Sequence, residues 1–193
     1  MLRRRFILTL PLLTPARSRA AGWEGPFTLA LLYANLAAVP ERRARFTEER
    51  RFAALDQPLL SQGRLLWRRP DLLEKHTEAP EAETLRITGD QVEVTQAGHP
   101  TRSLSLNAQP QLRGFVEAMR APLAGDLTTL ERLFDASLSG APAAWQLRLT
   151  PRDARMRQAL ATLEIEGALA EPRQIRLLQP NGDSQTLRIE PLP

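Results

Sequence analysis

The chain has 193 residues, no cysteine, a formal net charge of +4 and a sequence pI of about 10.7. This length suits a single domain that buries about two thirds of the surface its unfolded chain would expose. The lack of cysteine excludes disulfides, thiol chemistry and a lipid-modified N-terminal cysteine. The positive charge would ordinarily suggest an anionic partner, but its distribution along the chain argues otherwise.

The first twenty residues have the three parts of a secretory signal peptide. Residues 3–5 are arginines, residues 6–13 are a largely apolar run, and Ser18 and Ala20 are small residues at the positions that signal peptidase reads. The run is too short to span a membrane. We therefore predict cleavage after Ala20, a single domain over residues 21–193 and a periplasmic location.

Cleavage there removes five arginines and no acidic residue, so the formal charge falls from +4 to −1. A nearly neutral protein lacks the surplus of basic side chains that neutralises phosphates, so we expect no nucleic-acid partner. Residues 3–7, Arg-Arg-Arg-Phe-Ile, approximate the twin-arginine export pattern. Because arginine-rich starts are also common in ordinary secretory signals, we favour the Sec route.

The mature chain opens with a helix and a long strand. Residues Pro26 to Val39 place leucines on one helical face, and Pro40 ends the helix. In Arg42 to Leu55, Phe46 and Phe52 stand at even spacing among polar and charged residues, which predicts an exposed first strand.

A period-two pattern dominates the rest of the chain. Apolar residues alternate with polar ones in eight segments, as in antiparallel strands with one apolar and one hydrated face. The segments are marked by Leu65 and Trp67, Leu85 and Ile87, Val92 and Val94, Leu104 and Leu106, Trp145 to Leu149, Leu163 and Ile165, Ile175 and Leu177, and Leu187 and Ile189. Residues 88–90, 96–101 and 180–183 contain the glycine and asparagine of hairpin turns.

Two amphipathic helices interrupt the strands. Pro110 to Ala121 places Phe115 and Met119 on one apolar stripe, and Asp126 is the N-cap of a helix that reaches Phe134. The predicted fold is mainly β (α+β), with one antiparallel sheet and helices on its apolar face. A sheet of eight or more strands must curl, which gives an incomplete barrel. Its apolar interior is either an ordinary core or a container for an apolar ligand.

The sequence offers no catalytic or metal-binding pattern. It has no GxSxG, P-loop or GxGxxG motif and no His or acidic cluster at metal-ligand spacing. His76 and His99 are expected to be surface histidines. The acidic pairs at 48–49 and 164–166 would need a cleft to act as a glycosidase pair. We predict no catalytic residue, no metal and no cofactor, and therefore not an enzyme.

The stretch Gly63 to Glu74 (GRLLWRRPDLLE) joins an extended run to Arg68 and Arg69, and Pro70 stops it. A guanidinium at such a strand end could donate to carbonyls of a neighbouring element and act as a latch. It could equally be a solvated tip.

These motifs together resemble the LolA family of periplasmic outer-membrane lipoprotein carriers. The resemblance rests on the export signal, the leucine-rich first helix, residues 46–48 (Phe-Thr-Glu), residues 63–70 (GRLLWRRP) and a late strand, Asn-Gly turn and strand over residues 175–189. It covers most of the mature chain in order and spacing.

The resemblance implies a LolA/LolB-like unclosed barrel with lid helices, whose cavity takes lipoprotein acyl chains. Its partners would be acylated lipoproteins or another lipid cargo, a LolCDE-like inner-membrane ABC transporter and a LolB-like outer-membrane acceptor, and the protein would be a monomer. Arg69 would be the lid latch, and Leu73 would tune cargo retention. The cavity lining would comprise Leu65, Trp67, Leu73, Leu85, Ile87, Val92, Val94, Leu147, Ile165, Phe115 and Met119.

Two departures from the family pattern leave the cargo open. Residues 88–94 (TGDQVEV) lack the aromatic residues usual after the turn, and Phe-Thr-Gln becomes Phe-Thr-Glu at Glu48. Divergent LolA-like proteins with such features accompany aryl-polyene or other lipid export. A sensor of the same fold, like the RseB proteins, and a hydrolase dependent on His76 or His99 are the remaining alternatives.

Overall fold

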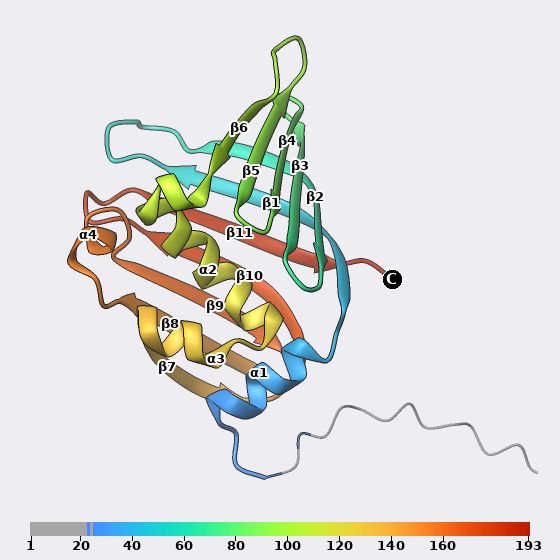
Figure 1. Ribbon diagram of the computed structural model, residues 1–193, viewed down its shortest axis with the longest axis vertical. Helices are drawn as coiled ribbons and strands as arrows, with labels where there is room; N and C mark the ends of the chain where they lie inside the picture. Colours follow the sequence, from blue (N-terminus) through green and yellow to red (C-terminus); the bar gives the residue numbers. More distant parts are fainter. Residues whose placement is uncertain (1–22, 24) are drawn as a thin grey trace, which may run out of the picture.

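The computed structural model describes residues 23 and 25–193, and its centre is one eleven-stranded antiparallel sheet (Figure 1). The strands are β1 (Glu41–Arg51), β2 (Leu59–Arg68), β3 (Leu72–Ala79), β4 (Glu83–Thr88), β5 (Gln91–Gln96), β6 (Arg102–Ser105), β7 (Phe134–Ala141), β8 (Ala144–Pro151), β9 (Thr162–Ala168), β10 (Glu171–Leu178) and β11 (Ser184–Pro191). The predicted signal peptide lies outside the described residues.

The strand order is β6-β5-β4-β3-β2-β1-β11-β10-β9-β8-β7. Two meanders, β1 to β6 and β7 to β11, are thus joined where the first strand pairs with the last. The edge strands β6 and β7 pair on one side each in the described chain, so the curled sheet is not closed. The prediction of a mainly β fold with one curled, unclosed antiparallel sheet is confirmed.

The helices lie on the concave side of this sheet (Figure 1). They are α1 (Leu29–Ala37), the short 3-10 turn η1 (Leu106–Ala108), α2 (Pro110–Ala124), α3 (Leu127–Leu133) and α4 (Ala154–Arg157). Thr28 caps α1 by accepting from the Leu31 amide at 3.2 Å, and Asp126 caps α3 by accepting from the Thr129 amide at 2.9 Å. Gly125, at φ 77°, makes the left-handed turn between α2 and α3.

Two cross-strand pairs of an aromatic residue and a glycine set how closely the concave face is packed. Phe46 lies opposite Gly63, and Trp145 lies opposite Gly167. A Cβ at Gly167 would fall 2.2 Å from the Trp145 ring, and one at Gly63 would fall 1.9 Å from the His76 carbonyl oxygen. Glycine is required at both positions because any side chain would collide with its neighbour.

Several predicted boundaries differ from the structure. The first strand ends at Arg51 rather than Leu55, because the Leu55 amide donates to the Phe52 carbonyl in a turn. Strand β7 was missed, since Phe134–Ala141 is rich in Ala, Ser and Gly and is a sheet edge. The four-residue α4 was also missed because it has too few residues for a periodic pattern.

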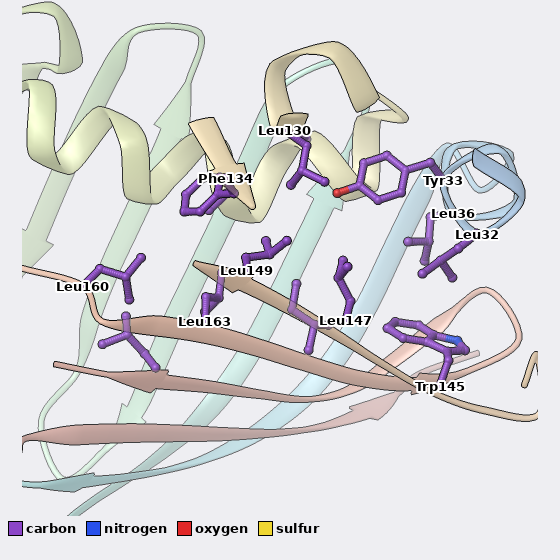
Figure 2. Close-up of a cluster of buried hydrophobic side chains, with 14 of the residues drawn as sticks. Leu32, Tyr33, Leu36, Leu130, Phe134, Trp145, Leu147, Leu149, Leu160 and Leu163 are labelled. Atoms are coloured by element: carbon purple, nitrogen blue, oxygen red, sulfur yellow. The ribbon is translucent and has the colours of Figure 1, made fainter. Parts of the chain in front are cut away.

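The larger hydrophobic core lies between α1, α3 and strands β8 to β10, and Figure 2 shows many of its side chains. Leu147, Leu149 and Leu163 are completely buried there under Leu130 and Phe134. A smaller core joins Ile87 and Val92 to Leu106 and Val116, under η1 and the first half of α2. Ala118 and Ala121 of α2 belong to the larger core, while Phe115 and Met119 of the same helix line a cavity over the sheet.

Candidate functional site

A cavity of about 290 Å³ lies between α2 and the concave face of the sheet. Its volume is close to the lower end of the range for small-molecule sites, about 300–1,000 Å³. The lining is mainly apolar and comes from Leu36 of α1, from α2 (Phe115, Val116, Met119, Pro122, Leu123) and from strands β1 to β4 and β8 to β11. An alkyl chain is the ligand that such walls suit, because burial of each CH₂ gains about 0.8 kcal/mol.

Most of the predicted lining residues lie on this cavity. Those that line it are Leu65, Trp67, Leu73, Leu85, Ile87, Leu147, Ile165, Phe115 and Met119. Val92 and Val94 are not among the residues that line it. Val92 packs with Leu106 and Val116 in the smaller core, and Val94 lies two residues further along β5, opposite Leu85. The functional role of the lining residues stays a prediction.

Arg69 lies at the corner between β2 and β3, and one of its terminal nitrogens donates to the carbonyl oxygen of Ala37 at 2.7 Å. Ala37 is the last residue of α1, whose final carbonyls have no partner within the helix. The side chain is exposed and reaches the helix from outside the cavity. Neighbouring Arg68 instead pairs with Glu41 on β1 at 2.7 Å. The latch role of Arg69 stays a prediction.

A second arginine holds the same helix end from inside. The guanidinium of Arg42 on β1 donates to Leu36 O at 2.6 Å, to Val39 O at 3.2 Å and to Ala170 O, in the turn after β9, at 3.1 Å. Burial lowers the pKa of Arg42, while nearby Glu171 opposes that shift. Sequence reasoning missed this residue, although Arg42 stands two and four positions before Ala44 and Phe46 and therefore on their face of the strand.

The opposite part of the cavity wall contains a buried polar cluster centred on Glu48, whose side chain is 1% exposed. Its carboxylate accepts from Lys75 at 2.5 Å, Ser61 at 2.6 Å and Arg50 at 3.1 Å, and also from Gln185. The Lys75 ammonium, from the only lysine in the chain, lies 4.9 Å from the centre of the Phe46 ring. From sequence, Glu48 was paired with Glu49, but its phase with Phe46 places it on the concave face.

The two members of this ion pair differ in how fully they are compensated. Burial would raise the pKa of Glu48, but hydrogen bonds from Lys75 and Ser61 and the charges of Lys75 and Arg50 outweigh it, so the pKa lies below its ordinary value. Burial lowers the pKa of Lys75 more than the bond to Glu48 raises it. The charge of Lys75 is compensated less fully because four side chains donate to Glu48, whereas Lys75 donates to Glu48 alone among the described residues.

The other candidates lie away from the cavity. His76 contacts Thr84 and Glu74, each at 3.1 Å, on the convex face, and His99 is exposed in the turn after β5. Glu164 pairs with Arg148 at 2.7 Å on the convex face. In the described part of the chain, no three His, Cys, Asp or Glu residues are grouped so that they could hold a metal ion. None of its helices has the length and apolar character needed to cross a membrane.

An unclosed antiparallel sheet with helices over an apolar cavity defines the class of hydrophobic-ligand carriers. Residues 28–189 match the family described as outer membrane lipoprotein carrier protein LolA-like, and the chain belongs to that family. The resemblance drawn from the sequence motifs is therefore confirmed. No curated protein gives a significant sequence match.

Solved structures that match this chain share little of its sequence. A LolA superfamily protein from Nitrosomonas europaea is 10% identical, with a TM-score of 0.41 over 83% of this chain and 90% of that one. A DUF1329 family protein from Desulfovibrio piger is 9% identical, with a TM-score of 0.39 over 83% and 88%. In the MucA/MucB complex of Pseudomonas aeruginosa the identity is 18% and the TM-score 0.36, over 83% of this chain and 54% of the matched one.

Proposed function

We propose that the protein is a periplasmic carrier that holds the acyl chains of lipoproteins in its cavity and moves them from the inner to the outer membrane. The observation that carries this proposal is the apolar cavity between α2 and the concave face of the sheet. Membership of the LolA-like family supports it. The work of such a protein is binding and release, and no catalytic step is required.

A carrier must both bind its ligand and release it. Burial of ten CH₂ groups would gain about 8 kcal/mol, which is enough to hold an alkyl chain but makes its release slow. Contacts that hold the cavity closed lower the net affinity for the ligand, because they must break before the ligand can enter. Arg69 and Arg42, which both hold the C-terminal end of α1, are suited to that role.

The cellular setting belongs to the same proposal. The signal-like residues 1–20 support export to the periplasm, with the Sec route favoured. Partners would then be a LolCDE-like transporter that loads the cargo and a LolB-like acceptor that receives it. We propose that the mature protein works as a monomer over residues 21–193.

The alternative is a carrier or sensor for another lipid, such as an aryl-polyene or glycolipid. One observation favours it. Buried Glu48 with its partners Lys75 and Arg50 puts charged groups beside the cavity, whereas a chamber for alkyl chains alone needs only apolar walls. Such groups suit a ligand with polar functions along its length.

A titration of the mature protein with N-phenyl-1-naphthylamine tests the carrier proposal. We expect saturable binding at one site, with displacement by a diacylated lipopeptide. Leu85→Trp, which fills the cavity from β4, should abolish binding. Leu104→Trp is the matched control, because Leu104 is 37% exposed on β6 and does not line the cavity. Absence of saturable binding to the wild-type protein would overturn the proposal, and displacement by a glycolipid but not by the lipopeptide would favour the alternative.

A further inference from the structure

Two buried donors at the α1 end of the cavity have no acceptor among the described residues. They are Nε1–H of Trp67 and Nε–H of Arg42. Trp67 is 3% exposed, and both residues line the cavity. A buried donor without a partner costs free energy, so two of them on one cavity wall call for an explanation.

The two donors lie together. Arg42 on β1 and Trp67 on β2 are direct partners in the strand register, and both side chains stand on the concave face. Side chains opposite each other on antiparallel strands have Cβ atoms about 4.5–5.5 Å apart. The two donors therefore belong to neighbouring side chains on one wall of the cavity.

Charge selects the kind of group. Arg42 is half-buried, with its Nε fully buried, and the carbonyls of Leu36, Val39 and Ala170 accept from its two terminal nitrogens. These contacts fix the side chain but leave Nε aimed at no protein acceptor. An oxygen with negative charge is the best complement to a buried cation and an indole donor.

We propose that Arg42 and Trp67 form a subsite for the acyl oxygen at the head of the ligand, with a free carboxylate preferred to an ester carbonyl. This inference rests on the proposed carrier function. The alkyl chain then extends from the α1 end past Leu65 and Leu73 toward Leu85 and Phe115, which line the cavity. A fatty acid or an esterified acyl chain supplies the same oxygen chemistry.

Trp145 provides a matched control within the same cavity. Its indole Nε1–H donates to the Leu169 carbonyl at 2.8 Å, so this nitrogen already has an acceptor. Like Trp67 it lines the cavity and is 3% exposed. Replacing either tryptophan by phenylalanine removes one ring and one N–H, but only Trp67→Phe removes a donor that has no acceptor among the described residues.

The experiment measures binding of parinaric acid and its methyl ester to the wild type, Trp67→Phe and Trp145→Phe. We expect the acid to bind the wild type about tenfold tighter than the ester, because it adds a charge-assisted hydrogen bond. Trp67→Phe should weaken binding of the acid by about fivefold or more, and Trp145→Phe should change it less than twofold. Equal loss in both variants, or no loss in Trp67→Phe, would overturn the subsite.

Indole N–H resonances give a second readout that does not depend on affinity. The chain has three tryptophans, and the two variants assign two of the three ¹⁵N–¹H indole cross-peaks. The Trp67 peak should move downfield when the acid binds, while the Trp145 peak should keep its position. A Trp67 peak that is unmoved by both bound ligands would overturn the proposal.

Arg42 is tested by Arg42→Lys, which keeps the charge but removes Nε. We expect this variant to bind both probes with a weaker preference for the acid over the ester, because the charge remains but the Nε–H donor is lost. If the wild type binds the ester as tightly as the acid and this binding still depends on Trp67, the subsite is assigned to an esterified acyl chain. If neither probe binds the wild type in a saturable manner, the carrier proposal fails; if both bind without dependence on Trp67, only the subsite fails.

Discussion

The two halves of the sheet carry the same alternation of apolar residues but bury it differently. In the half from β7 to β10, leucines such as Leu149 and Leu163 are completely buried under α1 and α3. In the half from β1 to β4, Leu65, Leu73 and Leu85 are half-buried and face the cavity under α2. The difference lies in the helices that cover each half. Where helices pack directly on the strands, the inward side chains form a core, and where they do not, the same pattern lines a cavity.

The polar groups follow the same division. The cavity wall includes the charged residues Arg42, Arg50 and Lys75. Charged groups are tolerated there because Glu48 and the end of α1 supply their partners. Unlike the core, the half from β1 to β4, which we call the open half, combines apolar walls with polar groups, which is the composition of a binding site.

The largest expected effect comes from truncating matched leucines in the two halves. Leu149→Ala should lower the free energy of unfolding by about 2–5 kcal/mol, because it opens a void in a packed core. Leu65→Ala should cost about 1 kcal/mol, since its side chain already faces the cavity. Urea unfolding of both variants measures the difference, and equal costs would show that the chamber is packed like the core.

Next in size is the loss of the buried carboxylate. Glu48→Gln should lower the free energy of unfolding by about 2 kcal/mol at pH 7, because Lys75 loses its charged partner. The pKa of Glu48 lies below its ordinary value in the folded protein, so its contribution is present above about pH 4.3 and is lost as the pH falls further. The difference between the variant and the wild type should therefore shrink as the pH falls below about 4.3.

Urea unfolding between pH 3 and pH 7 tests this dependence. Glu49→Gln is the control, because Glu49 is the adjacent acid and pairs with Arg51 at 2.5 Å on the exposed face. It should change the free energy of unfolding by less than about 0.5 kcal/mol. If the stability of the two variants follows the same course with pH, the buried cluster does not stabilise the open half.

A smaller effect is expected at the contact between the open half and α1. Arg69→Leu removes the donor to Ala37 O, so the protein should stay folded and shift toward an open form that holds its ligand. Because the bond is exposed, we expect release of a bound probe to slow by only about threefold to tenfold. Stopped-flow dilution measures the rate, and Arg68→Leu is the control because Arg68 pairs with Glu41 instead. A rate equal to that of the wild type would remove Arg69 from the mechanism.

The smallest effect is expected in the half from β7 to β10, which α1 and α3 cover. The Tyr33 hydroxyl is buried without a partner in the described structure, and Figure 2 shows it pointing toward Leu130. Burial, with a smaller effect from the charge of Asp126, raises the pKa of Tyr33 above its ordinary value. Tyr33→Phe should raise the free energy of unfolding by up to about 1 kcal/mol without affecting ligand binding. A loss of stability would indicate that the hydroxyl has a partner.

Much of this arrangement could be predicted from local patterns. The period-two segments, the hairpin turns and the two central helices follow from residue spacing, and the Phe46 and Arg69 motifs pointed to the family. Strand β7 escaped because an edge strand of small residues has little apolar alternation. Arg42 and Glu48 escaped because charge was taken to mean exposure, although both stand in phase with Phe46.

The sequence by itself determined most of the elements, the antiparallel sheet and the apolar side of most strands, because these depend on neighbours close along the chain. Only the tertiary structure decided which inward side chains are sealed and which line a cavity. That depends on where α1, α2 and α3 lie over the sheet and on the pairing of β1 with β11, contacts between residues far apart in sequence. The same long-range contacts brought Arg42, Trp67 and the end of α1 to one place.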